Sequence, residues 1–207
     1  MMPQTQLKLV NFNCHTLNPI NLELNHNETI SISGDSGTGK SLLLRAIADL
    51  IPHKGETYID DVSIKDIAAH EWRKRVAYFA AESQWWFDTI GEHFKLPLSK
   101  QIEAFLIEIG FNQEVFSWDV MRCSTGERQR LAIIRVLIND PDILLLDEPT
   151  ANLDSENTKR VEKIINEYQQ LSNCSIVWVS HDVSQKKRVS QRQFEIKNSE
   201  LVESTIA

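Results

Sequence analysis

Two segments in the second half of the chain are almost wholly apolar. They are residues 142–147 (DILLLD) and 175–180 (SIVWVS), and an uninterrupted apolar run is typical of a strand buried on both faces of a parallel sheet. Between them, Asp154 stands where a helix N-cap is expected, ahead of an apolar face at helical spacing. The residues of that face are Val161, Ile164, Ile165, Tyr168 and Leu171. Strands that alternate with helices predict a layered α/β fold.

The first half carries a strand, a glycine-rich turn and a helix in succession. Residues 29–33 (TISIS) alternate apolar and polar side chains, which predicts a strand. After the turn, a helix is expected over residues 40–50, with Leu43, Ile47 and Leu50 on one face. The turn therefore lies between the end of a strand and the start of a helix.

Shorter elements are expected around this core. The pattern indicates short strands over residues 56–59 and 75–80, a turn at Asp60 and Asp61, and closing strands over residues 192–202. These strands add a small β region to the parallel sheet.

The segment of residues 90–121 has a helical pattern. The apolar positions that share a face there are Ile102, Phe105, Leu106 and Ile109. We expect a helical subdomain over about residues 88–135, inserted in a single domain of residues 1–207.

Composition is that of a globular protein, with 42% hydrophobic and 25% charged residues. The net charge of −7 argues against a nucleic-acid binder, and the basic run at residues 186–188 is expected on a solvated helix face. The three cysteines form no CxxC pair, so neither a disulfide framework nor a zinc site is indicated. We expect no membrane span, which needs about 18 apolar residues, and no signal peptide in the N-terminal MMPQTQLKLVNFN.

The glycine-rich turn, GDSGTGKS, has the phosphate-loop pattern G-x-x-x-x-G-K-[ST]. Its residues are Gly34, Asp35, Ser36, Gly37, Thr38, Gly39, Lys40 and Ser41. Glycines allow backbone N–H groups to turn inward around phosphate oxygens, and the helix that follows directs its positive end at the same anion. Lys40 adds charge at the β and γ phosphates, and Ser41 offers a hydroxyl to Mg²⁺.

A second acidic motif ends the first apolar strand, in DILLLDEPT. The strand delivers Asp147 to the carboxyl edge of the sheet, where nucleotides bind in such folds. There Asp147 is placed to hold Mg²⁺, directly or through water, and Glu148 to polarise the attacking water.

A third motif, CSTGE, begins a helix. Ser124 and Glu127 form the capping-box pattern S-x-x-E, which is in itself a common helix start. A capped helix N-terminus with Gly126 beside it is also an anion site.

Taken together, these motifs resemble those of the ABC ATPases, in family order over nearly the whole chain. They correspond to the Walker A loop (GDSGTGKS), a variant LSGGQ signature (CSTGE), the apolar-DE motif (ILLLDEPT), the D-loop (residues 151–154, ANLD) and the switch histidine (SHD, with His181). The resemblance implies a P-loop NTPase core of ABC ATPase type with a small antiparallel β region and a short helical subdomain.

The resemblance also implies an assembly. Two copies would pack head to tail as a homodimer around ATP and Mg²⁺, each ATP lying between the phosphate loop of one copy and the signature of the other. The signature contributes Ser124, Thr125, Gly126 and Glu127, and His181 would hold the attacking water with Glu148. A separate transmembrane permease would be moved by hydrolysis. The chain would lie at the cytoplasmic face of the membrane, touching neither nucleic acid nor the transported molecule.

Four departures from the family pattern stand out. Thr125 replaces a glycine of the signature, and Ala81 stands where the Q-loop glutamine is usual, with Glu82 and Gln84 nearby. Cys14 occupies the place of the adenine-stacking aromatic residue, beside Phe12 and His15, so that stacking on the base is expected either to be weak or to come from His15. The helical block is short, so that the chain is similar in size to small bacterial cassettes assigned to the export of metals such as iron, or of haem.

The aromatic run Trp85, Trp86 and Phe87 has two interpretations. It belongs either to the core or to an exposed patch that receives a helix of the membrane subunit, since aromatic residues are enriched at such contacts.

Two other functions compete with that of a transport motor. One is a switch that binds ATP and dimerises but barely hydrolyses it, which the missing Q-loop glutamine favours and Glu148 and His181 oppose. The other is an ABC ATPase that acts on DNA or ribosomes, against which the acidic charge and the lack of room for a long coiled coil argue.

Overall fold

The computed structural model describes residues 5–15 and 17–204, so the first four residues of the N-terminal stretch considered above lie outside it. The larger of its two sheets has six strands in the order β10-β9-β3-β8-β7-β6. These strands are β3 (Thr29–Ser33), β6 (Val76–Phe79), β7 (Ile143–Asp147), β8 (Ser175–Val179), β9 (Arg192–Lys197) and β10 (Glu200–Ser204). All neighbouring pairs are parallel except β9 and β10, which are antiparallel.

The smaller sheet is antiparallel, with the strand order β2-β1-β4-β5. Its strands are β1 (Thr5–Asn13), β2 (Ile20–Asn25), β4 (Lys54–Ile59) and β5 (Val62–Ser63). The two sheets confirm the expected combination of an α/β core with a small antiparallel β region.

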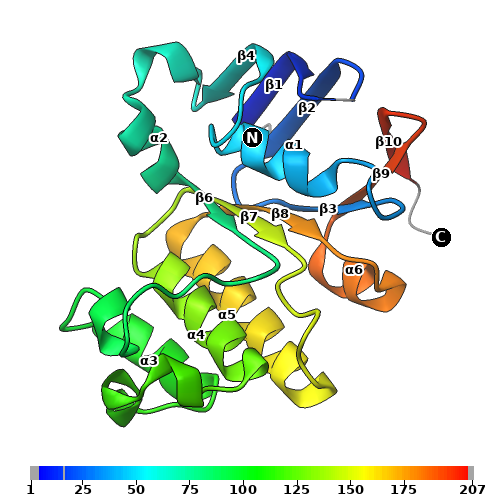
Figure 1. Ribbon diagram of the computed structural model, residues 1–207. Helices are drawn as coiled ribbons and strands as arrows, with labels where there is room; N and C mark the ends of the chain where they lie inside the picture. The colour runs from blue at the N-terminus through cyan, green and yellow to red at the C-terminus, as the bar shows by residue number, and fades with distance from the viewer. Residues whose placement is uncertain (1–4, 16, 205–207) are drawn as a thin grey trace.

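Helices cover both faces of the larger sheet (Figure 1). They are α1 (Lys40–Ile47), α2 (Ala69–Arg75), α3 (Lys100–Glu108), α4 (Thr125–Leu137), α5 (Ser155–Ser172) and α6 (Val183–Val189). Short 3-10 helices are η1 (Ile64–Asp66), η2 (Gly91–His93), η3 (Gln113–Ser117) and η4 (Val120–Arg122). Helix α1 lies between the two sheets, whereas α4 and α5 cover the opposite face of the larger sheet, with α3 beyond them (Figure 1). Among the described residues, none of the helices is long and apolar enough to cross a membrane.

Two hydrophobic cores lie on the two faces of the larger sheet. Alternate residues of one strand serve both cores, because successive side chains of a strand point to opposite faces. In β8, Ile176 and Trp178 pack with α4 and α5, while Val177 and Val179 pack with α1 and the smaller sheet. All five residues of β7 and of β8 are buried, as the apolar runs predicted. The strands that end at the functional motifs are thereby packed against apolar side chains on both faces of the sheet.

Two details of the expected pattern were wrong. Helix α1 ends at Ile47, so Leu50 is 49% exposed and does not continue its buried face. Leu171 is 67% exposed near the end of α5, although the other four residues of that predicted face are buried. The block of residues 90–121, where a helical pattern was expected, contains one α-helix together with short 3-10 helices.

Candidate functional site

The phosphate loop connects the carboxyl end of β3 to helix α1, as predicted. Gly34 has φ +140°, and a Cβ at this position would lie 2.7 Å from the carbonyl oxygen of Ile196. Gly39 has φ +101° and directly precedes α1. Both positions favour glycine, because an L side chain is strained at such angles. Around Gly37, in contrast, a Cβ would meet no atom within 4 Å, so this part of the loop faces open space.

Lys40 is buried at the start of α1 and folds back over its own loop. Its Nζ donates hydrogen bonds to the carbonyl oxygens of Gly34 (2.7 Å) and Asp35 (2.8 Å). Burial lowers the pKa of this amine, an effect that the nearby carboxylates of Glu148 and Asp147 oppose. Lys40 is therefore positioned at the centre of the loop, close to both acidic residues of the second motif.

Asp147 ends β7 with its side chain buried, and it is held from the neighbouring strand β6. The Tyr78 hydroxyl donates a hydrogen bond of 2.9 Å to its Oδ2, and Arg45 Nε donates one of 3.3 Å to the same hydroxyl. Burial raises the pKa of Tyr78 to about 12, so this hydroxyl remains protonated near neutral pH. Sequence reasoning missed Tyr78, although a polar-tipped aromatic residue inside a buried strand was a signal that it needed a partner.

Glu148 and His181 follow adjacent parallel strands and meet at their carboxyl ends. His181 Nε2 lies 3.1 Å from Glu148 Oε1, and their side chains are 48% and 32% exposed, so water reaches both. The backbone N–H of Glu148 donates to the carbonyl of Val179, the last residue of β8. Glu148 itself has φ +48°, a left-handed conformation that costs a residue with a side chain about 1 kcal/mol or more. The two residues assigned to the attacking water are thus in contact.

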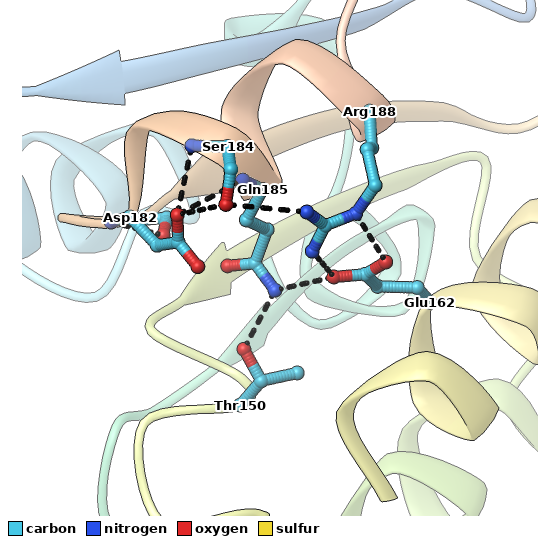
Figure 2. Close-up of polar contacts among 7 residues, drawn as sticks. Thr150, Glu162, Asp182, Ser184, Gln185 and Arg188 are labelled. Atoms are coloured by element: carbon cyan, nitrogen blue, oxygen red, sulfur yellow. Dashed lines mark hydrogen bonds and ion pairs between the residues drawn. The ribbon is translucent and has the colours of Figure 1, made fainter. Parts of the chain in front are cut away.

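Beside this pair the surface is hollowed by a cavity of about 570 Å³. Its lining includes Glu148 and His181 together with residues of the segment after β7 and of helices α5 and α6. Asp182 caps α6 by accepting hydrogen bonds from the backbone N–H groups of Ser184 and Gln185 (Figure 2). The Ser184 hydroxyl and these N–H groups lower the pKa of Asp182.

The signature residues form the predicted capping box at the start of α4. The N–H and the hydroxyl of Ser124 donate to Glu127 Oε2 (2.7 and 2.8 Å), and the N–H of Glu127 donates to Ser124 Oγ. These bonds lower the pKa of Glu127. Ser124 and Thr125 are exposed. Within the described residues, no hydrogen bond or ion pair joins the signature to the phosphate loop of the same copy.

The segment expected to contact the adenine lies next to the phosphate loop, since Leu17 is within 3.6 Å of where a Cβ on Gly39 would be. Cys14 and Phe12 are buried, which prevents either from stacking on a base. His15 is exposed, with φ +51°. Of the three residues considered for stacking, only His15 presents its ring to solvent.

The three aromatic residues after β6 divide between the core and the surface. Trp85 packs against the core and lies under Arg135, whose guanidinium carbon is 4.4 Å from its ring centroid. Trp86 and Phe87 are 64% and 48% exposed, and their backbone N–H groups both donate to His93 Nε2 (2.9 and 3.0 Å). Two adjacent aromatic side chains are therefore held on the surface by a fixed backbone.

Comparison with known proteins places the chain among transporter proteins. The sequence profile of the family described as ABC transporter matches residues 17–151. The energy-coupling factor transporter ATP-binding protein EcfA2 of Staphylococcus aureus is 29% identical over 206 residues, which cover 91% of this chain and 72% of the relative.

Solved structures share the fold over nearly the whole chain. The protein cbiO1 of Clostridium perfringens, part of the ABC transporter complex cbiONQ, superposes with a TM-score of 0.80 at 22% identity, covering 96% of this chain and 87% of that one. The ATP-binding cassette MJ0796, in a dimeric post-hydrolysis state with ADP and Pi, superposes with a TM-score of 0.81 at 25% identity, covering 97% of this chain and 99% of that one.

Proposed function

The chain belongs to the ABC transporter family, and from this premise we propose that it hydrolyses ATP to ADP and phosphate and thereby moves a separate membrane subunit. The observation that carries the proposal is the 3.1 Å contact between Glu148 and His181, directly beyond Asp147 and at the same sheet edge as the phosphate loop. A carboxylate and an imidazole that are in contact with each other and exposed to solvent are suited to orient and deprotonate a water molecule.

The phosphate loop is proposed to bind the triphosphate. Its fit rests on the glycine-lined backbone, which has no room for a Cβ at Gly34 and open space at Gly37. On binding, Lys40 would exchange the carbonyl oxygens of Gly34 and Asp35 for phosphate oxygens. The exposed ring of His15 is the proposed support for the adenine base.

The hydroxyl of Ser41 and the carboxylate of Asp147 fit Mg²⁺, because hard cations prefer oxygen donors. The ion would supply neutralisation of the charge that develops on the phosphates during transfer. Tyr78 fixes the direction of the Asp147 carboxylate from the side of β6. Glu148 would then take the proton of the attacking water while His181 holds that water and the terminal phosphate.

We propose a head-to-tail homodimer as the active form. Ser124, Thr125 and Gly126 are proposed to complete the site of a second copy, with Glu127 holding them through the capping box. Two facts support this assembly: the exposure of Ser124 and Thr125, and the dimeric state of the MJ0796 cassette with ADP and Pi.

The membrane partner is proposed to dock at Trp86 and Phe87, beside the helical subdomain of about residues 88–135 within the single domain. The relative EcfA2 is the ATP-binding protein of a transporter, which supports a chain that works at the cytoplasmic face of a membrane. In this role neither nucleic acid nor the transported molecule contacts the chain.

The test is ATP hydrolysis by the purified chain beside Glu148→Gln, with dimer size followed by gel filtration in ATP. Removing the base should slow turnover about 100-fold or more while an ATP-dependent dimer persists. Glu167→Gln, which changes an exposed glutamate of α5 in the same way, should retain the wild-type rate. An unchanged rate in Glu148→Gln would refute the assigned chemistry.

A second candidate function is a switch that dimerises with ATP without turning it over. Ala81 favours it, because a methyl side chain at the Q-loop position has no group to bind metal or water. Wild-type protein that dimerises with Mg²⁺ and ATP but shows no single-turnover hydrolysis would establish the switch instead of the motor.

A further inference from the structure

A buried side-chain amide connects the segment after β7, which begins with Glu148, to helix α6, which follows His181. Gln185, in α6, is only 3% exposed. Its Nε2 donates one hydrogen bond to Thr150 Oγ1 (2.9 Å) and another to Glu162 Oε1 (2.8 Å) (Figure 2). A single side chain thus joins α6, the segment after β7 and helix α5.

Both catalytic residues lie close to the ends of this connection. Thr150 follows Glu148 by two residues and directly precedes the D-loop. Its carbonyl accepts a hydrogen bond from the N–H of Leu153, within the D-loop. At the other end, Asp182 directly follows His181 and caps the helix that carries Gln185. The bond between Gln185 and Thr150 therefore spans the two loops that place Glu148 and His181 in contact.

The surroundings hold this connection in one geometry. Arg188 Nη2 and Nε donate to the two carboxylate oxygens of Glu162 (2.9 and 3.2 Å), so the acceptor of Gln185 is itself fixed (Figure 2). Gln129 of α4 donates to the carbonyl of Pro149, the residue before Thr150 (3.3 Å). Because a buried donor without a partner is costly, the amide of Gln185 has a strong preference for this arrangement.

We propose that Gln185 is a positioning residue for hydrolysis: by holding Thr150 and Glu162 together, it keeps Glu148 and His181 in register around the attacking water. The inference rests on the proposed ATPase function. The phosphate loop takes no part in the hydrogen bonds of Gln185. Removing the Gln185 amide should therefore lower the rate of hydrolysis and leave ATP binding unchanged.

The test compares Gln185→Met with a matched control, Gln169→Met. Gln169 is also a buried glutamine whose Nε2 donates to a threonine hydroxyl at 2.9 Å, but its partner is Thr29, at the start of β3 and away from the motifs. For Gln185→Met we expect kcat to fall about ten-fold or more, because the bonds to Thr150 and to Glu162 are both lost, with KM for ATP unchanged. The control should lose a similar few degrees of Tm and keep kcat.

Thr150→Val tests the same bond from its other end and covers the case in which Gln185→Met does not fold. It should also lower kcat, and the double variant should be no slower than Gln185→Met alone, because Gln185→Met already removes the bond to Thr150. Equal kcat losses in Gln185→Met and Gln169→Met, or a change in KM alone, would overturn the proposal. A wild-type protein that hydrolyses no ATP would refute the proposed ATPase function itself. The wild-type rate therefore separates failure of the proposed function from failure of the role given to Gln185.

Discussion

Replacing Tyr78 with phenylalanine removes one hydroxyl from the support of the metal-binding carboxylate. Asp147 is 2% exposed, so water does not replace the lost donor. A hydrogen bond to a charged group contributes about 1.5–3 kcal/mol. Arg45 is exposed and regains its lost bond from solvent, so it adds little to the cost. For a chain of this length, 2 kcal/mol corresponds to a fall in Tm of about 4–8 °C.

The same substitution should weaken Mg²⁺ binding. Partners that orient a metal ligand are typically worth 10–100-fold in affinity, and we expect the Mg²⁺ concentration for half-maximal hydrolysis to rise about ten-fold. The assay is ATPase activity titrated with Mg²⁺ at saturating ATP. Tyr168→Phe is the matched control, since that buried hydroxyl lies 3.1 Å from Asp140 Oδ1, which precedes β7, whereas Asp147 ends this strand. Equal Mg²⁺ midpoints in the two variants would refute the reasoning.

Three further predictions concern other parts of the site. Gly34→Ala should be destabilised more than Gly37→Ala in thermal melts, because both have positive φ but only the first places its Cβ 2.7 Å from a carbonyl oxygen; equal melting temperatures would contradict this. Ser124→Arg should still bind ATP but fail to dimerise with it by gel filtration, because its added bulk occupies the proposed interface. Asp154 has a lowered pKa because the Asn157 N–H donates to it, so its contribution to stability is complete above about pH 4 and lost as pH falls through its folded pKa. The Tm deficit of Asp154→Asn relative to wild type should therefore shrink between pH 7 and pH 3, and a constant deficit would be evidence against this account.

Sequence reasoning succeeded where one local feature determines the structure. The phosphate loop, the Asp154 cap and the Ser124–Glu127 capping box depend on residues within one turn of each other, and each forms as expected. The buried strands β7 and β8 were predicted equally well, because a continuous run of apolar residues is stable only in the protein interior.

The errors and omissions concern contacts between distant segments. Leu50 and Leu171 continue a helical spacing, but the chain leaves the helix before Leu50, and Leu171 lies in the last turn of α5, beyond the core. Tyr78 and Gln185 find their partners 69 and 35 residues away. Nothing in the local spacing of either residue indicates which strand or loop will lie beside it.

The left-handed backbone of Glu148 sets two selective pressures against each other. At φ +48° glycine is the least strained residue, so Glu148→Gly would gain about 1 kcal/mol of stability while losing the proposed base. A lineage released from the need to turn over ATP is expected to drift at this position early, since the change is favourable for folding. Glycine at this place in a related chain would accordingly mark a cassette that has kept its architecture and given up hydrolysis.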